Sequence, residues 1–412
     1  MTTQQKIISF TVLCCAIICH TACSQNNNNR KTSVSSVAIP AEVINLPGVE
    51  TPIYMSGYGS AMAYCEKENV FYLLTDRGPN VDGKTPESKV FAVPSFVPHI
   101  GKFRLQNGEL ILIEKIELKD KKGNYFSGIP NVNGNGSTNE TAYNLKGEVI
   151  GNDNRRGLDT EGLALAPDGS FWISDEYGPY IMRFDAQGNL KDEFSPFNGI
   201  LPEHYALRRP NRGMEGLTIS KDGKTLTGIM QSPLYNPSKE TKDKSLVIRI
   251  ISINLELEEI SEYLYLLDDA KCSVSEILTL NDNEFLVLER DSKFPEKGKG
   301  FKKIFKIDLS QATNIAEDAR TFETMSAQTL AENNIRTAKK ELFLDILEAI
   351  PGYPHDKPEG IALMNNNRTL CIVNDDDFSI DAPKTPDGTI VPKLMSNGER
   401  DKGMIYFVEI GE

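Results

Sequence analysis

Carboxylate side chains recur in this sequence at the two ends of a short repeated unit. The unit holds a Glu, a small hydrophobic strand, a tight polar turn and a second hydrophobic strand that ends in another acid. Its clearest copy runs from Asp159 to Glu176, and weaker copies begin near residues 60, 214, 275 and 358. Such self-similarity is typical of repeat architectures, in which equivalent residues of stacked units come together. A carboxylate present in unit after unit therefore predicts a ring of acids.

Such a ring needs protons or cations, because like charges held close together are unfavourable. Oxygen-rich surroundings with few histidines suit Ca²⁺, which takes six to eight oxygen ligands. The predicted metal ligands are Asp76, Glu161, Asp175, Glu215, Glu276, Glu289, Glu359 and Asp375. The alternative is structural: a carboxylate beside a tight turn also accepts backbone N–H bonds, and that role would repeat with the unit.

Arginines accompany the acids. A guanidinium group matches a phosphate or carboxylate with two parallel hydrogen bonds. We therefore predict that a small anionic ester substrate is bound by Arg77, Arg156, Arg209, Arg212 and Arg290. The alternative is that these side chains form ion pairs with the same acids across the repeats.

The sequence contains no Gly-x-Ser-x-Gly motif of a serine hydrolase. If hydrolysis occurs, the residue types favour water activated by bound metal, a carboxylate base and an arginine that stabilises developing charge. The catalytic candidates are Asp175, Glu176, His204 and His355, with a purely loop role as the alternative for the two histidines.

Short hydrophobic runs of four to eight residues, bounded by Gly, Pro, Asn and Asp, predict an all-β protein. Each repeat holds about four strands, which is the size of a propeller blade. Five visible copies and room for another in residues 78–157 predict a β-propeller with six blades, and a β-sandwich is the alternative. Residues 119–157 are rich in Gly and Asn and predict a long insertion, whereas apolar positions at helical spacing predict a short helical insertion in residues 326–350.

Composition excludes several functions. With 25% charged and 39% hydrophobic residues the chain is typical of a globular protein, and its net charge of -13 argues against nucleic-acid binding. Cys65, Cys272 and Cys371 lie far apart in or beside apolar runs, so we expect free thiols rather than disulfides or a zinc site. We expect a monomer.

The N-terminus reads as an export signal. Lys6 precedes an apolar run over residues 7–19 that is too short to span a bilayer, followed by Ala22-Cys23 and a polar tether. This pattern resembles a bacterial lipoprotein cleavage site with Cys23 as the lipidated residue, and plain secretion is the alternative. The predicted divisions are a signal peptide over residues 1–22, a lipidated tether over 23–40 and a propeller domain over 41–412. We expect a periplasmic or outer-membrane protein that contacts the membrane only through its lipid.

Several conspicuous motifs occur along the chain: Glu161-Gly162-Leu163 with Asp175-Glu176-Tyr177-Gly178-Pro179, Thr75-Asp76-Arg77-Gly78-Pro79, Asn211-Arg212-Gly213-Met214-Glu215-Gly216, Leu288-Glu289-Arg290-Asp291, and Glu359-Gly360 with Asn374-Asp375. Together they resemble one known family, the bacterial phytase-like proteins, which are described by an esterase-like activity of phytase. The motifs span roughly residues 50–410. The resemblance implies a propeller with acidic, metal-binding residues and a hydrolase of phosphoesters or related esters. The rival expectations are a Ca²⁺-dependent lactonase or carboxylesterase, and a non-catalytic propeller that binds a ligand or a protein.

Overall fold

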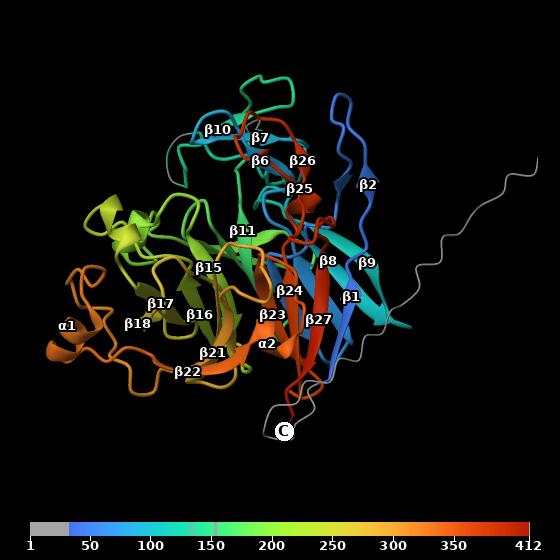
Figure 1. Cartoon of the computed structure of the whole chain (residues 1–412). Coiled ribbons are helices and arrows are strands. Elements are labelled where there is room, and N and C mark those ends of the chain that lie inside the picture. The colour runs from blue at the N-terminus through green and yellow to red at the C-terminus, as the bar shows by residue number, and fades with distance from the viewer. Residues whose placement is uncertain (1–32, 133, 135, 152–154, 412) are drawn as a thin grey trace, which may run out of the picture.

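Five four-stranded antiparallel sheets build the body of the protein (Figure 1). The computed structural model describes residues 33–132, 134, 136–151 and 155–411. Blade 1 contains β4 (Ala61–Cys65), β5 (Val70–Leu74), β8 (His99–Gln106) and β9 (Glu109–Glu117), and blade 2 contains β11 (Thr160–Leu165), β12 (Phe171–Asp175), β13 (Tyr180–Phe184) and β14 (Leu190–Phe194). Blade 3 contains β15 (Met214–Ile219), β16 (Thr225–Met230), β17 (Val247–Asn254) and β18 (Glu259–Leu266), and blade 4 contains β19 (Ser273–Thr279), β20 (Glu284–Arg290), β21 (Lys302–Asp308) and β22 (Lys339–Asp345). Blade 5 contains β23 (Pro358–Met364), β24 (Thr369–Asn374), β27 (Met404–Glu409) and β1 (Val34–Ala38).

The first strands of the blades close a ring. Each of β4, β11, β15, β19 and β23 packs against the first strand of the next blade, and β23 returns to β4. The protein is therefore an all-β propeller, as predicted, but among the described residues it has five blades and not six. The region expected to hold a sixth blade instead supplies β8 and β9 to blade 1 and strands outside the ring.

Hydrophobic cores lie between neighbouring blades. One core joins blades 1 and 2, a larger one joins blades 2, 3 and 4, and two others join blade 4 to blade 5 and blade 5 to blade 1. The second strands β5, β12 and β24 are buried along their whole length because both faces of each sheet are covered. Trp172, the single Trp, lies in the largest core, and Cys65, Cys272 and Cys371 are free thiols as expected.

Insertions in blades 1 and 5, together with the segment that connects blade 1 to blade 2, form a cap above one end of the ring (Figure 1). The cap consists of the sheet β6 (Asn80–Asp82), β7 (Ser88–Phe91) and β10 (Thr141–Tyr143), the pair β25 (Ile380–Asp381) and β26 (Val391–Pro392), and the 3₁₀ turn η3 (Asp377–Ser379). It has its own apolar core, which includes Val81, Phe96 and Phe378. The residues predicted as a long insertion thus contribute to a cover over the mouth of the channel. The pair β2 (Val43–Ile44) and β3 (Ile53–Tyr54) lies outside the blades.

Helix is confined to short segments: α1 (Ala327–Glu332), α2 (Ile346–Ala349), and the 3₁₀ turns η1 (Glu203–Leu207) and η2 (Lys239–Asp243). The predicted helical insertion in residues 326–350 is partly confirmed. This segment contains α1 and α2, but β22, the outermost strand of blade 4, lies between them. No helix in the described ranges is long and apolar enough to cross a membrane.

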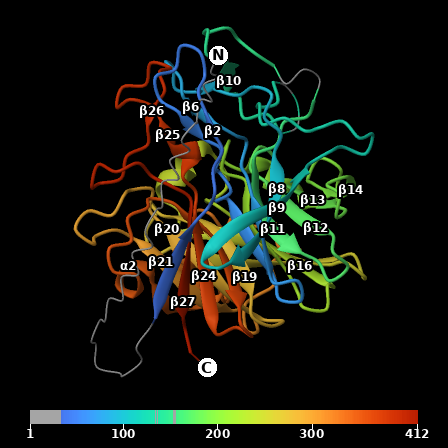
Figure 2. The same ribbon diagram turned by 90° about the vertical axis from the view of Figure 1, so that its right-hand side faces the viewer.

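The N-terminal strand β1 completes blade 5. It pairs antiparallel with β27 from Val34–Val408 to Ala38–Met404, and the two strands run side by side in Figure 2. The propeller therefore begins at residue 34, earlier than the predicted boundary at 41. The predicted signal peptide and Cys23 lie outside the described residues.

We expect loss of β1 to destabilise the whole propeller. A chain that starts at Pro40 lacks the buried Val37 and Ile39 and leaves the edge of β27 unpaired. Burial of two such side chains contributes about 3–6 kcal/mol to the free energy of unfolding. Thermal or urea unfolding of this chain against one that starts at Ser33 measures the effect. Equal stability of the two chains would contradict a role for β1 in ring closure.

Candidate functional site

A polar cavity of about 260 Å³ lies between the mouth of the channel and the cap. Its charged lining comprises ten acids, Asp76, Asp82, Asp159, Glu161, Glu176, Glu215, Glu359, Asp375, Asp377 and Asp381, and five cations, Arg77, Lys89, Arg212, Arg290 and Lys357. Fully ionised, this lining carries a net charge of -5. No His or Cys belongs to this lining. The structure thus brings together five of the eight acids predicted as metal ligands, namely Asp76, Glu161, Glu215, Glu359 and Asp375.

A β-bulge aims one set of these acids into the cavity. In blades 2, 3 and 5 the pairing of the first two strands shifts by one residue, between Thr160 and Leu163, Met214 and Gly216, and Pro358 and Gly360. The bulge residues are Glu161, Glu215 and Glu359, and a bulge changes the direction in which a side chain points. The following glycine allows close approach of the next blade: a Cβ at Gly162 would lie 2.5 Å from the carbonyl oxygen of Glu215.

A second set lies at or just beyond the end of the second strand of each blade. Equivalent backbone bonds connect Glu176 N–H to Asp159 O, Gln231 N–H to Gly213 O and Asp375 N–H to Lys357 O. By this register the five blades contribute, in order, Asp76, Glu176, Gln231, Arg290 and Asp375, and all five line the cavity. The repeated carboxylate is therefore replaced by an amide in blade 3 and by a guanidinium group in blade 4.

The remaining predicted acids lie one residue out of this register. In blade 4 the shift falls between Val274 and Glu276, so Ser275 takes the place of the bulge Glu and Glu276 takes the place of the glycine. Asp175 and Glu289 precede the cavity residues Glu176 and Arg290 by one position. A displacement of one residue in a strand points the side chain to the opposite face. None of the three lines the cavity.

These three carboxylates have partners elsewhere. Asp175 accepts bonds from the N–H groups of Asp159 and Gly178 at 2.7 and 2.9 Å. Glu276 accepts from Leu217 N–H at 3.2 Å. Glu289 accepts from the Tyr265 hydroxyl at 2.6 Å and is paired with Lys340 at 2.7 Å. The three carboxylates are therefore bound by hydrogen bonds within and between blades, which is the structural role given above as the alternative to metal binding.

Both predicted catalytic histidines also lie away from the cavity lining. His204 contacts Glu262 at 2.8 Å, and His355 is buried between Asp401 at 2.6 Å and the Tyr406 hydroxyl at 2.8 Å. Of the five predicted arginines, Arg77, Arg212 and Arg290 line the cavity, whereas Arg156 is paired with Glu193 and Arg209 lies in the turn beside Arg212.

Three acids on the blade 2 side form a compact group, which we call the acid trio: Asp159, Glu161 and Glu176. Each offers a carboxylate oxygen within 4.8 Å of the others. Glu161 is 8% exposed, and no described residue donates a hydrogen bond to its carboxylate or forms an ion pair with it. Burial, followed by repulsion from Glu215, raises the pKa of Glu161 and Glu176 well above the ordinary value. A cation bound beside Glu161 and Glu176 would therefore favour their ionised form.

The cations of the cavity differ in how far they are neutralised. Arg77 is paired with Glu140 and Asp159, and Arg290 is paired with Glu359. Arg212 donates to the amide oxygen of Gln231 and forms no ion pair with a carboxylate of the described chain. Burial lowers the pKa of Arg212. Its guanidinium group therefore has donor capacity left for an anion.

Gln231 links the acid trio to Glu215. Its Nε2 donates to Glu176 Oε1 at 2.9 Å and to Glu215 Oε2 at 2.6 Å, while its Oε1 accepts from Arg212. A carboxylate at this position could not donate hydrogen bonds to two acids. The neutral amide of Gln231 can, and it thereby holds the side chains of Glu176 and Glu215 in place. Three further cavity residues were not predicted: Gln231, Asp159 and Lys357. Each occupies a fixed position relative to the bulge Glu of its blade, and that position in the repeat could have identified it.

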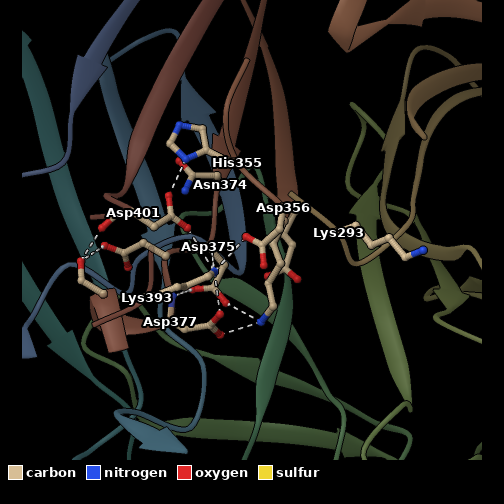
Figure 3. A network of polar contacts seen from close by, with 12 residues as sticks. Lys293, His355, Asp356, Asn374, Asp375, Asp377, Lys393 and Asp401 are labelled. Carbon is tan, nitrogen blue, oxygen red and sulfur yellow. Dashed lines mark hydrogen bonds and ion pairs between the residues drawn. The ribbon is translucent and has the colours of Figure 1, made fainter. Parts of the chain in front are cut away.

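A buried lysine anchors the cap to blade 5 (Figure 3). Lys393 Nζ lies 2.7 Å from Asp377, 2.9 Å from Asp356 and 3.1 Å from Asp401. Asp401 also contacts His355, so the network extends from the core of blade 5 to the cavity lining. Lys393 is 2% exposed, and its ammonium group offsets several carboxylates that would otherwise repel one another.

We expect Lys393→Met to lower the free energy of unfolding by about 3–5 kcal/mol, because it leaves buried carboxylates without their cation. Lys89→Met is the matched control, since Lys89 pairs at 2.5 Å with the exposed Asp82 and should change stability by less than about 1 kcal/mol. Chemical unfolding of both variants decides the matter, and similar losses in the two would refute an anchoring role for Lys393.

The fold and the cavity define a class of protein, a capped five-bladed propeller with an acidic site at the mouth of its channel. Residues 54–378 match the model of the Phytase-like family, described as esterase-like activity of phytase, and the chain belongs to that family. A protein of Arthroderma benhamiae described as an uncharacterized secreted protein is 25% identical over 348 residues, which cover 67% of this chain and 66% of that protein. The match thus spans just under two thirds of the relative's length.

Solved structures with a similar fold are more distant. Virginiamycin B lyase from Staphylococcus aureus is 12% identical with a TM-score of 0.32, and the alignment covers 92% of this chain and 99% of that one. A GH43 β-1,3-galactosidase is 9% identical with a TM-score of 0.38 over 85% of this chain and 94% of that one. The family assignment rests on the sequence match.

Proposed function

We propose that the protein is an exported, metal-dependent hydrolase that cleaves a phosphoester or a related anionic ester in the capped cavity. The observation that carries the proposal is Glu161, a carboxylate buried in the acid trio with no donor or cation from the described chain. Membership of the Phytase-like family supports the reaction class.

The donor set fits Ca²⁺. Asp159, Glu161 and Glu176 supply carboxylate oxygens, and the cavity lining offers neither imidazole nor thiolate, the ligands that Zn²⁺ and Cu ions favour. Water and backbone carbonyls usually complete the six to eight oxygens of a Ca²⁺ site. Ca²⁺ is therefore the cofactor that we propose.

The residues around the acid trio suit the handling of an anionic ester. Arg212 would bind an anionic oxygen of the substrate and stabilise the charge that develops on it. Glu215 would accept a proton from the attacking water, because Gln231 holds its Oε2 and no described donor binds its Oε1. A bound divalent ion would polarise the ester and lower the pKa of a coordinated water.

Arg212 favours an anionic substrate over the neutral ester of a lactonase. Arg212 is half-buried, and a partly desolvated guanidinium group without a carboxylate partner is stabilised by a bound anion. The same side chain would serve a non-catalytic propeller that binds an anion, so turnover has to be measured directly.

We further propose export followed by attachment through a lipid on Cys23, at the periplasm or outer membrane. The export signal in the sequence and the secreted relative from Arthroderma benhamiae support export. The proposal of a lipid anchor rests on the sequence around Cys23, which resembles a lipoprotein cleavage site.

Ca²⁺ should stabilise the protein through the acid trio. We expect the melting temperature to rise with Ca²⁺ and to fall with EGTA. In Glu161→Gln the Ca²⁺ response should be lost, while the metal-free protein should become more stable, because a buried carboxyl group whose pKa is raised by burial and by repulsion from Glu215 has been removed. The exposed Glu114→Gln is the control and should behave as the unchanged chain. A Glu161→Gln variant that keeps the full Ca²⁺ response would exclude the trio as the metal site.

Arg212→Lys should raise KM for an anionic ester at least tenfold, since an ammonium group cannot replace the two-pronged contact of a guanidinium group. Arg209→Lys is the matched control, because Arg209 lies in the same turn but outside the cavity lining. Steady-state kinetics with a phosphomonoester, inositol hexakisphosphate and a short carboxylic ester, each with Ca²⁺ and with EGTA, also identify the ester class. Preferred turnover of the neutral ester, unaffected by Arg212→Lys, would favour the lactonase or carboxylesterase alternative.

A further inference from the structure

Lys357 occupies in blade 5 the position that Asp159 occupies in blade 2. Each lies two residues before the bulge Glu, and each accepts through its carbonyl oxygen the N–H of the residue at the end of the second strand, Asp375 or Glu176. Both side chains line the cavity. The same place in the repeat therefore carries a negative charge in one blade and a positive charge in the other.

The ammonium group of Lys357 lies between two carboxylates of the cavity. Its Nζ is 3.1 Å from Asp375 Oδ2 and 2.6 Å from Asp377 Oδ1. The other oxygens are also engaged: Asp375 Oδ1 accepts from Asp377 N–H at 2.9 Å, and Asp377 Oδ2 is paired with Lys393 at 2.7 Å. Although burial acts to raise it, the two lysines hold the pKa of Asp377 below its usual range.

The acid trio is the opposite case. Glu161 has no donor and no cationic partner among the described residues, and the trio contains no lysine. Arg77 pairs with Asp159 at 3.4 Å and donates its backbone N–H to the same carboxylate at 3.2 Å, but it forms no ion pair with Glu161 or Glu176. Two acidic groups therefore line one cavity. Lys357 and Lys393 neutralise Asp375 and Asp377, whereas the described chain provides the trio only with Arg77 on Asp159 and leaves Glu161 and Glu176 without a cation.

We propose that the ammonium group of Lys357 takes the place of a second divalent cation, so that the cavity binds one divalent ion, at the acid trio, and not two. The proposal rests on the metal site of the proposed function and adds its stoichiometry. A divalent ion at Asp375 and Asp377 would have to displace an ammonium group held at 2.6 Å and a backbone N–H, whereas an ion at Glu161 displaces no protein partner. Hydrolysis by this protein would then depend on one metal ion with Arg212 as the second positive group, in contrast to a two-metal site.

The number of bound ions tests this directly. The protein is the chain from Ser24 onward, which contains every strand of the propeller, and the probe is Ca²⁺, counted by calorimetry and by elemental analysis. We expect one ion in the unchanged chain, two in Lys357→Met, and one again in Lys357→Met/Asp375→Asn. Lys89→Met removes a different lysine of the lining and should bind one ion.

Two further variants test the proposal without altering Lys357. Asp159→Asn should weaken Ca²⁺ binding at least tenfold, whereas Asp375→Asn should change it by less than twofold. A tenfold loss in Asp375→Asn would overturn the proposal even if Lys357→Met fails to fold.

The outcomes separate this proposal from the one on which it rests. An unchanged chain that binds no ion would overturn the proposed metal site itself. An unchanged chain that binds two ions, or a folded Lys357→Met variant that binds only one, would overturn the role of Lys357 and leave the acid trio standing.

Discussion

Repulsion between buried carboxylates is the constraint on which the rest of this site depends. A closed ring of equivalent strands brings the same position of every blade to one axis, so an acid that is harmless in one blade becomes a neighbour of four others. In water such charges would be screened, but at the mouth of this channel burial removes most of the solvent. Each departure from exact repetition can be understood as a response to that repulsion.

The blades respond in different ways. Blade 4 replaces the terminal acid by Arg290, which is paired with Glu359 of blade 5. Blade 3 replaces it by Gln231, which donates to two acids at once. Blade 5 keeps its acid and adds Lys357, and the cap adds Lys393 behind it. Blade 2 keeps three carboxylates and adds no cation of its own. Arg77 of blade 1 pairs with Asp159 and leaves Glu161 and Glu176 without a cation among the described residues, which makes that sector of the ring distinct from the others.

The sequence predicted the class of fold and that acids of different repeats come together, because the hairpin pattern and its turn residues recur along the chain. It failed where one residue of register decides the outcome. Glu276 looks equivalent to Glu161, yet the bulge in blade 4 falls on Ser275. The one local sign of this difference is that Glu276 is followed by Ile277, whereas the bulge Glu of blades 2, 3 and 5 is followed by Gly. Asp175 and Glu176 are neighbours, so their side chains point to opposite faces of the strand. The sequence does not show which of the two faces the cavity, and the structure places Glu176 there and not Asp175. The predicted number of six blades was wrong for a different reason: the insertions that form the cap contain strands and turns like those of a blade.

The pairing of β1 with β27 places contacts between residues 374 positions apart, from Val34 to Val408, at the last joint of the ring. Contacts so distant along the chain form late, because their loop-closure entropy is lost before they contribute. Blade 5 also carries Glu359, Asp375 and Lys357, so one wall of the cavity stays incomplete until the final strand has docked. A chain that crosses a membrane from its N-terminus would thus emerge with its acids spread along an open arc, and would acquire a concentrated negative centre only after its last residues had passed.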